Sequence, residues 1–379
     1  MAEGRGRGGA AEVQPLPEGL VASMLAWYDE MRRDLPWRRT HDAYAILVSE
    51  IMLQQTRVET VLGRYESFLA RFPTIGDLAA APLDDVLAEW SGLGYYRRPR
   101  GLHALARTVV EKHDGEIPET LEELLALPGL GPYTAAAVGS IAFGIPALSV
   151  DGNVGRILCR IGAMEDDPKR APVRRELEAM VAEAMEKHPP GELNQAIMEI
   201  GARVCAPRSP RCHECPCASY CEAHALGIEE LIPPSSKETV HAVTEYAAVI
   251  ESEGRYLLLR GQRPTLVTDM WEFPTLDSRL APRGSKAILK RHLGELGWRV
   301  NIGTKLAEIR HGMTNRRITC RLYEGCLEES GNRISDEEPR PMPIPEHGWF
   351  SLAEILELPL AASARKTIDA VLDTPLSST

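Results

Sequence analysis

Five cysteines within seventeen residues constrain this chain more than any other feature of its sequence. They lie in "CAPRSPRCHECPCASYC", residues 205–221, and only three further cysteines occur elsewhere in the 379 residues. Cys217 falls outside the spacing C-x6-C-x2-C-x5-C, which the other four follow: Cys205, Cys212, Cys215 and Cys221. Four thiolates in one short loop can bind tetrahedral zinc or a 4Fe-4S cluster, and the spacing alone leaves both open. Either metal would be structural, because four protein ligands leave no coordination position for chemistry.

The composition predicts more than one domain and a reducing environment. With 379 residues, of which 44% are hydrophobic and 26% charged, the chain can bury more than one core. No apolar run is long enough to span a bilayer, and residues 1–19 contain arginines and acids without a hydrophobic stretch. We therefore expect a disordered tail at residues 1–19 and no membrane association. Without an export signal the thiols should stay reduced, and clustered reduced cysteines favour metal binding over disulfide bonds.

The charge balance limits how the chain could bind nucleic acid. Phosphate binding depends largely on lysine and arginine, so a formal net charge of −11 requires any DNA-binding surface to be a local patch. Candidate patches are "RRDLPWRR", which contains Arg38, "YYRRPR", and the cysteine loop. Each group taken singly is better explained by solvated arginines balanced by nearby acids.

Hydrophobic periodicity changes once along the chain and predicts two domains of different class. Residues 20–225 repeat Leu, Ala and Glu every three or four positions, which predicts an all-α domain. Residues 242–374 contain short runs with strand character, such as "RYLLLRGQ", around one helical segment, "SKAILKRHLGEL". A second domain of α+β type is therefore expected after a linker at residues 226–241, which contains Pro-Pro-Ser-Ser.

The stretch "LPGLGPYTAAAVGSIAFG" predicts a tight turn between two helices. Gly129 and Gly131 would lie in this turn, at the start of the second helix. Bare backbone amides and the helix dipole at such a position can bind a phosphate without any side chain. Taken alone, the same pattern is also typical of an ordinary helix terminus.

Two carboxyl groups are expected in different environments. Asp151 in "LSVDGNVGRIL" precedes a helical stretch and reads as an N-cap, and backbone amides favour its ionised form. Glu50 lies in "YAILVSEIMLQQT" among apolar residues, where desolvation would raise its pKa and keep a proton available near neutral pH. Breaking a glycosidic bond requires this division of labour, with an acid on the leaving group and a carboxylate facing the cationic sugar. The alternative for Asp151 is a helix cap without a catalytic role, and the alternative for Glu50 is an exposed helix glutamate.

Several motifs together resemble the MutY-type adenine DNA glycosylases of the endonuclease III superfamily. They are "SEIMLQQT", "GLGYY", "LPGLGPYTA", "DGNV" and the cysteine spacing, and the resemblance covers almost all of residues 20–225. It implies a helix-hairpin-helix glycosylase domain with a 4Fe-4S cluster on the four spaced cysteines. It also implies hydrolysis of the N-glycosidic bond of adenine mispaired with 8-oxoguanine or guanine in double-stranded DNA. Glu50 and Asp151 occupy the positions of the family's catalytic glutamate and aspartate.

The resemblance extends to further residues around the base. It implies that Tyr133 and Asn153 support Asp151 at the sugar. The target adenine must leave the base stack to be reached, and apolar or aromatic side chains commonly hold a duplex open. By the same resemblance, the residues that fill or wedge the gap are Gln55, Thr56, Leu93 and Tyr95. A tyrosine packed in the core would explain Tyr95 alone equally well, but the preceding "GLG" favours an exposed turn.

The sequence predicts a glycosylase without built-in strand cleavage. In bifunctional relatives a lysine follows the hairpin, at the place that Tyr133 occupies here. A lyase that acts through a Schiff base needs an amine, and residues 1–225 contain only Lys112, Lys169 and Lys187, none of them in a motif.

The C-terminal domain resembles the Nudix-like damage-recognition domain of the same family. "KRHLGELG" aligns with part of the Nudix box but retains only Glu295 of its three glutamates, too few to hold Mg²⁺ for nucleotide hydrolysis. A Phe-Ser-His element of the family, which contacts 8-oxoguanine, aligns with Met313, Thr314 and Asn315. We therefore predict that Thr314 reads the base opposite adenine.

Three other functions fit the sequence less well. The missing lysine argues against a bifunctional pyrimidine glycosylase, and the incomplete Nudix box argues against a nucleotide hydrolase. The presence of both Glu50 and Asp151 argues against a lesion reader without activity. The expected protein is a monomer, cytoplasmic and of bacterial type, associated with the nucleoid.

Overall fold

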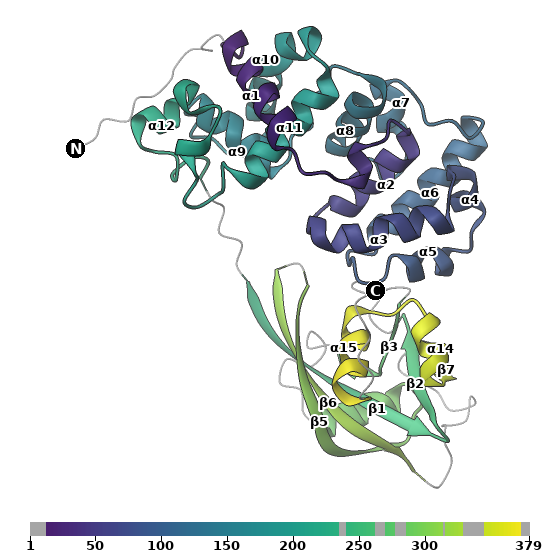
Figure 1. Ribbon diagram of the computed structural model, residues 1–379. Helices are drawn as coiled ribbons and strands as arrows, with labels where there is room; N and C mark the ends of the chain where they lie inside the picture. Colours follow the sequence, from purple (N-terminus) through teal and green to yellow (C-terminus); the bar gives the residue numbers. More distant parts are fainter. Residues whose placement is uncertain are drawn as a thin grey trace. The chain divides into compact units, whose positions relative to one another are not determined.

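The computed structural model describes residues 13–234, 240–261, 270–276, 286–313, 315–328 and 345–372 (Figure 1). The chain divides into two compact units. Unit 1 takes its described residues from Met1–Ala80 and Gly101–Ser236, and unit 2 from Ala81–Arg100 and Lys237–Thr379. The later boundary falls within the predicted linker at residues 226–241. Unit 2 also includes residues 81–100, which the sequence assigned to the helical domain.

The regular secondary structure of unit 1 consists only of helices in its described residues, which confirms the predicted all-α class. Its early helices are drawn in purple and blue and its later ones in teal in Figure 1. No helix in the described part of the chain is long and apolar enough to cross a membrane. The helices are α1 (Glu18–Met31), η1 (Pro36–Arg38), α2 (Ala43–Leu53), α3 (Val58–Arg71), α4 (Ile75–Ala80), α6 (Arg97–Lys112, entered from unit 2), α7 (Leu121–Ala126), α8 (Pro132–Phe143), α9 (Gly152–Ile161), α10 (Ala171–Lys187), α11 (Pro190–Arg203), η2 (Cys212–Glu214), η3 (Ala218–Tyr220) and α12 (Glu222–Leu226).

One hydrophobic core joins the N-terminal helix to the cysteine loop. Helix α1 buries Leu20, Val21, Met24 and Tyr28, a spacing that places them on one helical face. The first three of these side chains pack with buried residues of α9, α10 and α11. Cys217 belongs to the same core, so the cysteine loop is part of the folded unit.

Helix α2 is buried along almost its whole length. It begins at Asp42, whose side chain accepts a hydrogen bond from the amide of Ala45 at 2.7 Å. All residues from Tyr44 to Met52 are buried, because the helix is apolar on every side apart from Ser49 and Glu50. The sequence of this helix therefore carries a carboxyl group into the interior.

The two glycines of the hairpin between α7 and α8 have different surroundings. Gly129 has φ +79°, and a Cβ there would lie 3.0 Å from the Cα of Gly101, so the fold itself requires glycine. Gly131 precedes α8 as its N-cap with φ −87°, is exposed, and has open space where a Cβ would be. Nothing within the described protein therefore requires a glycine at position 131.

Unit 2 contains a mixed sheet, drawn in green in Figure 1. Among its described residues the order is β3-β2-β1-β6-β5, with β4 paired to β1 and β7 to β2. The β1–β6 pair is parallel, with His241 opposite Arg316, and the other pairs are antiparallel. The strands are β1 (His241–Ser252), β2 (Arg255–Arg260), β3 (Trp271–Glu272), β4 (Thr275–Leu276), β5 (Val300–Met313), β6 (Arg316–Leu327) and β7 (Glu346–Phe350).

Helices cover both faces of this sheet, as the alternation of buried residues dictates. Ala248 and Ile250 of β1 pack with Leu289 and Leu293 of α13 (Lys286–Glu295). Val249, between them, faces the other way and packs with residues of α14 (Leu352–Glu357) and α15 (Ala362–Val371). This arrangement confirms the predicted α+β class.

Candidate active site

Glu50 combines burial with a hydrogen bond to a phenol. Its side chain, carried by α2, is 7% exposed and accepts a hydrogen bond from the Tyr133 hydroxyl at 3.1 Å. Burial raises the pKa of Glu50 to about 7, and the charge of Asp151 adds to this. The Tyr133 hydrogen bond and the charge of Arg38 act in the opposite direction. A carboxylic acid with this pKa retains its proton in a large fraction of molecules near neutral pH.

Asp151 caps α9 as the sequence predicts. One carboxylate oxygen accepts hydrogen bonds from the backbone amides of Asn153 at 2.8 Å and Val154 at 2.7 Å. The other oxygen accepts from Nδ2 of Asn153 at 3.1 Å. Asn153 therefore orients both oxygens, and the structure brings Glu50, Tyr133, Asp151 and Asn153 into one electrostatic group.

A buried arginine connects this cap to the cysteine loop. Arg156 donates to Oδ1 of Asn153 at 2.9 Å and, through Nε, to the carbonyl of Cys205 at 2.7 Å. A further hydrogen bond reaches the carbonyl of Gly201 at 2.8 Å. Arg156 was not among the residues predicted from the sequence, although its place on α9, five residues after the N-cap Asp151, was a usable signal.

Glu199 is a second buried carboxyl group of unit 1 that the sequence analysis missed. It is 1% exposed and accepts hydrogen bonds from Arg33 at 2.7 and 2.8 Å and from Arg38 at 2.8 Å. Burial acts to raise its pKa, but the hydrogen bonds and charges of the two arginines outweigh it and hold that pKa at about 2. Arg38, a predicted DNA contact, is thus committed to Glu199 and to the carbonyl of Arg33 at 3.1 Å.

The residues predicted at the base gap fall into two places. Gln55 and Thr56 follow α2 in unit 1. Gln55 is exposed with φ +56°, and Thr56 is half-buried. Leu93 and Tyr95 lie in unit 2, where Leu93 is 4% exposed and Tyr95 is 46% exposed with φ +51°. Left-handed backbone at a non-glycine residue is strained, and such strain is concentrated at functional sites.

Thr314 and Glu295 are two residues of unit 2 that the sequence singles out. Thr314 lies outside the described residues. Glu295, the one retained glutamate of the Nudix box, lies on α13 near Arg291 and His292, at 3.9 and 4.0 Å. The prediction that unit 2 does not hydrolyse nucleotides stays a prediction.

The cysteine loop encloses a site that could hold a metal centre. All five of its cysteines line one small cavity, together with Arg160, His224 and Glu229. Arg160 is buried and donates to Sγ of Cys205 at 3.3 Å, so a positive charge lies beside the thiols. A hydrogen bond from Cys217 lowers the pKa of Cys215 to about 7, while the pKa of Cys217 is raised. These thiols and the adjacent cation fit a thiolate-bound cluster.

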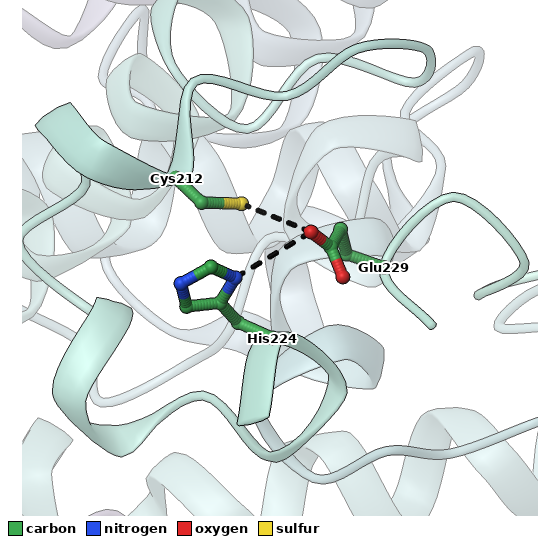
Figure 2. A group of neighbouring side chains, drawn as sticks. All are labelled: Cys212, His224 and Glu229. Atoms are coloured by element: carbon green, nitrogen blue, oxygen red, sulfur yellow. Dashed lines mark hydrogen bonds and ion pairs between the residues drawn. The ribbon is translucent and has the colours of Figure 1, made fainter. Parts of the chain in front are cut away.

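A mixed group of ligand atoms lies at the edge of the same cavity. Figure 2 shows Cys212 and His224 directed toward Glu229. Oε1 of Glu229 lies 3.8 Å from Sγ of Cys212 and 3.4 Å from Nδ1 of His224. One ligand atom from each residue lies within 4.8 Å of the others, so these three could also hold a metal ion.

Comparisons with known proteins assign both units. Residues 48–201 match the HhH-GPD superfamily of base excision DNA repair proteins, and residues 245–370 match the NUDIX domain. The human "Adenine DNA glycosylase" is 36% identical over 365 residues, which cover 81% of this chain and 66% of the human protein. The rat protein of the same name is 33% identical and covers 91% of this chain, which spans 76% of the rat protein.

Among solved structures, a thermostable thymine-DNA glycosylase is similar at 30% identity with a TM-score of 0.50. The similarity covers 54% of this chain and 95% of that one. The helical fold of unit 1 and the named relatives agree. The chain belongs to the adenine DNA glycosylase family of the HhH-GPD superfamily.

Proposed function

We propose that this protein is an adenine DNA glycosylase that hydrolyses the N-glycosidic bond of adenine paired with 8-oxoguanine or guanine in duplex DNA. The names of its relatives support adenine as the base that is removed. The observation that carries the proposal is the pairing of Glu50, with its pKa raised to about 7, and the helix-capping Asp151. An acid that keeps its proton beside a carboxylate is the arrangement that glycosidic cleavage requires.

Each residue of the site has a distinct role in this proposal. The adenine is extruded from the duplex, because it is unreachable within the stack. Glu50 donates its proton to the extruded base, and the Tyr133 hydroxyl keeps the carboxyl group in place. Asp151, oriented by Asn153, stabilises the positive charge that develops on the sugar. Water then completes hydrolysis and leaves an abasic site.

The proposal includes the absence of strong lyase activity. Strand cleavage through a Schiff base needs an amine nucleophile, and Tyr133 occupies the place of the lysine that bifunctional relatives use. The phenol of Tyr133 is instead hydrogen-bonded to Glu50. Its pKa is raised well above the ordinary value, chiefly by burial, so it remains a neutral hydrogen-bond donor.

The metal centre is proposed to be a structural 4Fe-4S cluster on Cys205, Cys212, Cys215 and Cys221. Four thiols around one cavity and the guanidinium of Arg160 beside them support this assignment over a zinc ion at Cys212, His224 and Glu229. Metal analysis of the purified protein should find iron, with Cys217→Ser leaving the iron content unchanged. Zinc in place of iron would overturn the cluster, and loss of iron in Cys217→Ser would make Cys217 a ligand.

We further propose that the protein works as a monomer in the cytoplasm, associated with the nucleoid. Size-exclusion chromatography with light scattering tests the first statement. Imaging of a tagged protein tests the second, with diffuse or membrane-bound signal as the contrary result.

The decisive experiment is a panel of duplexes that each carry one defined mispair, scored for strand breaks before and after alkali. Breaks at adenine opposite 8-oxoguanine and guanine should appear only after alkali. An intact adenine in both duplexes would overturn the function, and breaks before alkali would overturn the lack of lyase activity. If Thr314 reads the oxidised base by a hydrogen bond worth about 1 kcal/mol, Thr314→Val should narrow the ratio of the two rates about fivefold.

A further inference from the structure

Residues 81–100 belong to unit 2, although they lie within the HhH-GPD match at residues 48–201. The chain leaves unit 1 after Ala80, contributes helix α5 (Leu83–Glu89) and the loop after it to unit 2, and returns to unit 1 at Gly101. This segment contains Leu93 and Tyr95, two of the four residues predicted to fill or wedge the gap left by the extruded base. The support of that loop therefore comes from the unit that carries the NUDIX match.

Apolar contacts hold residues 81–100 in unit 2. Leu87 is fully buried in one core with Trp271 and Leu360, and Leu83 and Tyr96 pack against the same core. The Tyr96 hydroxyl donates a hydrogen bond to the carbonyl of Leu360 at 3.2 Å. Helix α5 thus joins the layer of helices that α14 and α15 form on one face of the sheet.

An ion pair ties α5 to the end of β2. Nη1 of Arg260 donates to Oδ2 of Asp84 at 2.9 Å, and Nη2 of Arg260 donates to Oδ1 of Asp84. The Arg260 side chain is only 15% exposed and lies over the ring of Trp271, 5.9 Å from its centroid. A bidentate ion pair with a largely buried guanidinium constrains the orientation of α5 more than an exposed ion pair would.

The loop after α5 has a fixed shape. The guanidinium of Arg98 donates to the carbonyls of Leu93 at 2.8 Å and Gly94 at 2.9 Å. It also lies over the rings of Trp90 and Tyr95, at 5.3 and 5.5 Å from their centroids. These contacts hold Tyr95 in its left-handed backbone conformation with the ring exposed. A loop organised in this way loses little freedom when it enters a duplex.

We propose that Asp84 and Arg260 are positioning residues. Through this ion pair the NUDIX-matched part of unit 2 sets how the loop that carries Leu93 and Tyr95 is placed against DNA. The NUDIX-matched part of unit 2 then contributes directly to base extrusion, in addition to any reading of the base opposite adenine. The inference rests on the proposed function, since it assumes that adenine is extruded from a duplex. It predicts that loss of the ion pair impairs extrusion and leaves the chemical step intact.

The test uses the full-length protein with Asp84→Asn, Arg260→Met and the double variant. Asn keeps the shape of Asp84 and Met keeps the apolar stem over Trp271, so both variants should fold. Arg255→Gln is the matched control, because Arg255 forms an exposed ion pair with Glu354 elsewhere in unit 2. Two duplexes are compared, with adenine opposite 8-oxoguanine and with adenine opposite an abasic site, where extrusion requires little unpairing.

Each single variant should excise paired adenine about tenfold more slowly, in keeping with loss of a charge-assisted hydrogen bond. Excision opposite the abasic site should stay within about twofold, and the double variant should be no slower than the slower single variant. 2-Aminopurine placed beside the target should show a correspondingly smaller rise in fluorescence on binding. A merely structural role would slow both duplexes equally and leave the fluorescence rise unchanged.

Three results would overturn the inference: equal slowing on both duplexes, an unchanged fluorescence rise, or the same effect from Arg255→Gln. All three leave adenine excision by the unaltered protein in place, so the proposed function would stand. Failure of the unaltered protein to excise adenine from either duplex would instead remove the proposed function and the inference with it.

Discussion

Two buried glutamates of unit 1 lie in similar local sequences and have opposite electrostatic properties. Glu50 is 7% exposed and burial raises its pKa to about 7, whereas Glu199 is 1% exposed and has a pKa of about 2. Burial acts to raise the pKa in both cases. The difference is that Arg33 and Arg38 hydrogen-bond to Glu199, while the hydrogen-bond donor to Glu50 is the neutral Tyr133 hydroxyl. Burial beside a phenol keeps a proton, and burial between two guanidinium groups keeps a charge.

Arg38 influences both glutamates and shows how the difference between their pKa values is maintained. It is hydrogen-bonded to Glu199 at 2.8 Å, and its charge lowers the pKa of Glu50 only as the last of four contributions. A guanidinium bonded directly to Glu50 would remove the proton that the proposed chemistry needs. The commitment of Arg38 to Glu199 therefore helps to keep Glu50 an acid.

The largest expected effect is the loss of adenine excision in Glu50→Gln. The amide keeps the shape of the side chain but has no proton to transfer, and general acid catalysis is worth about 10²- to 10⁴-fold in rate. Single-turnover rates on a duplex with an adenine mispair measure this, and duplex binding should survive. Glu66→Gln, an exposed glutamate of α3, is the control and should keep the full rate. An undiminished rate in Glu50→Gln would remove Glu50 from the mechanism.

The second prediction concerns stability at Glu199. Glu199→Gln leaves Arg33 and Arg38 without their counter-charge, and breaking a buried ion pair costs about 3–5 kcal/mol. Denaturant unfolding at pH 7 measures the loss. Glu183→Gln, which removes one partner of an exposed pair with Lys187, should cost no more than about 1 kcal/mol. Similar losses in the two variants would show that the network around Glu199 contributes no more than a surface pair.

The pH dependence at Glu199 follows from the sign of its shift. Its pKa falls from 4.5 in the unfolded chain to about 2 in the folded protein, so its contribution to stability is present above pH 4.5. That contribution is lost as pH falls toward 2. The difference in stability between the unaltered protein and Glu199→Gln should therefore shrink over this range.

The sequence predicts one of these two glutamates and misses the other, for a physical reason. Both sit in short apolar stretches, "SEIML" and "MEIGA", which predict burial. The prediction for Glu50 succeeds because burial dominates its pKa. Glu199 depends on arginines more than 160 residues away, and local sequence carries no information about that contact.

The rest of the fold and site divides in the same way, into features set by local sequence and features set by contacts between residues far apart in the chain. Helix periodicity, the turn glycines and the cysteine spacing are local signals, and the structure agrees with the fold class that they predict. The assignment of residues 81–100 to unit 2 depends on contacts such as Asp84 with Arg260 across the sequence.

The third prediction uses pH to distinguish the two glutamates in the rate of reaction. Protonated Glu50 is the active form, so the single-turnover rate should be level below pH 7 and fall about tenfold per unit above it. Glu199 stays ionised through this range and should contribute nothing to the profile. Residual activity of Glu50→Gln should be independent of pH between 6 and 9. A profile that rises through pH 7 would mean that the ionised form of Glu50 is the active one.

The smallest expected effect is a gain in stability from the same Glu50→Gln change. Between its unfolded pKa of 4.5 and its folded pKa of about 7, Glu50 binds more proton in the folded state, so its contribution to stability is lost as pH rises through 7. A neutral amide avoids the burial of that charge and keeps a partner for the Tyr133 hydroxyl. At pH 8 we expect Glu50→Gln to be about 1–3 kcal/mol more stable than the unaltered protein, with little difference at pH 5. Denaturant unfolding at both pH values measures this, and Glu199→Gln should change stability in the opposite direction. A variant of Glu50 that is destabilised at pH 8 would mean that the folded protein stabilises the ionised carboxylate, and the contrast between the two glutamates would fail.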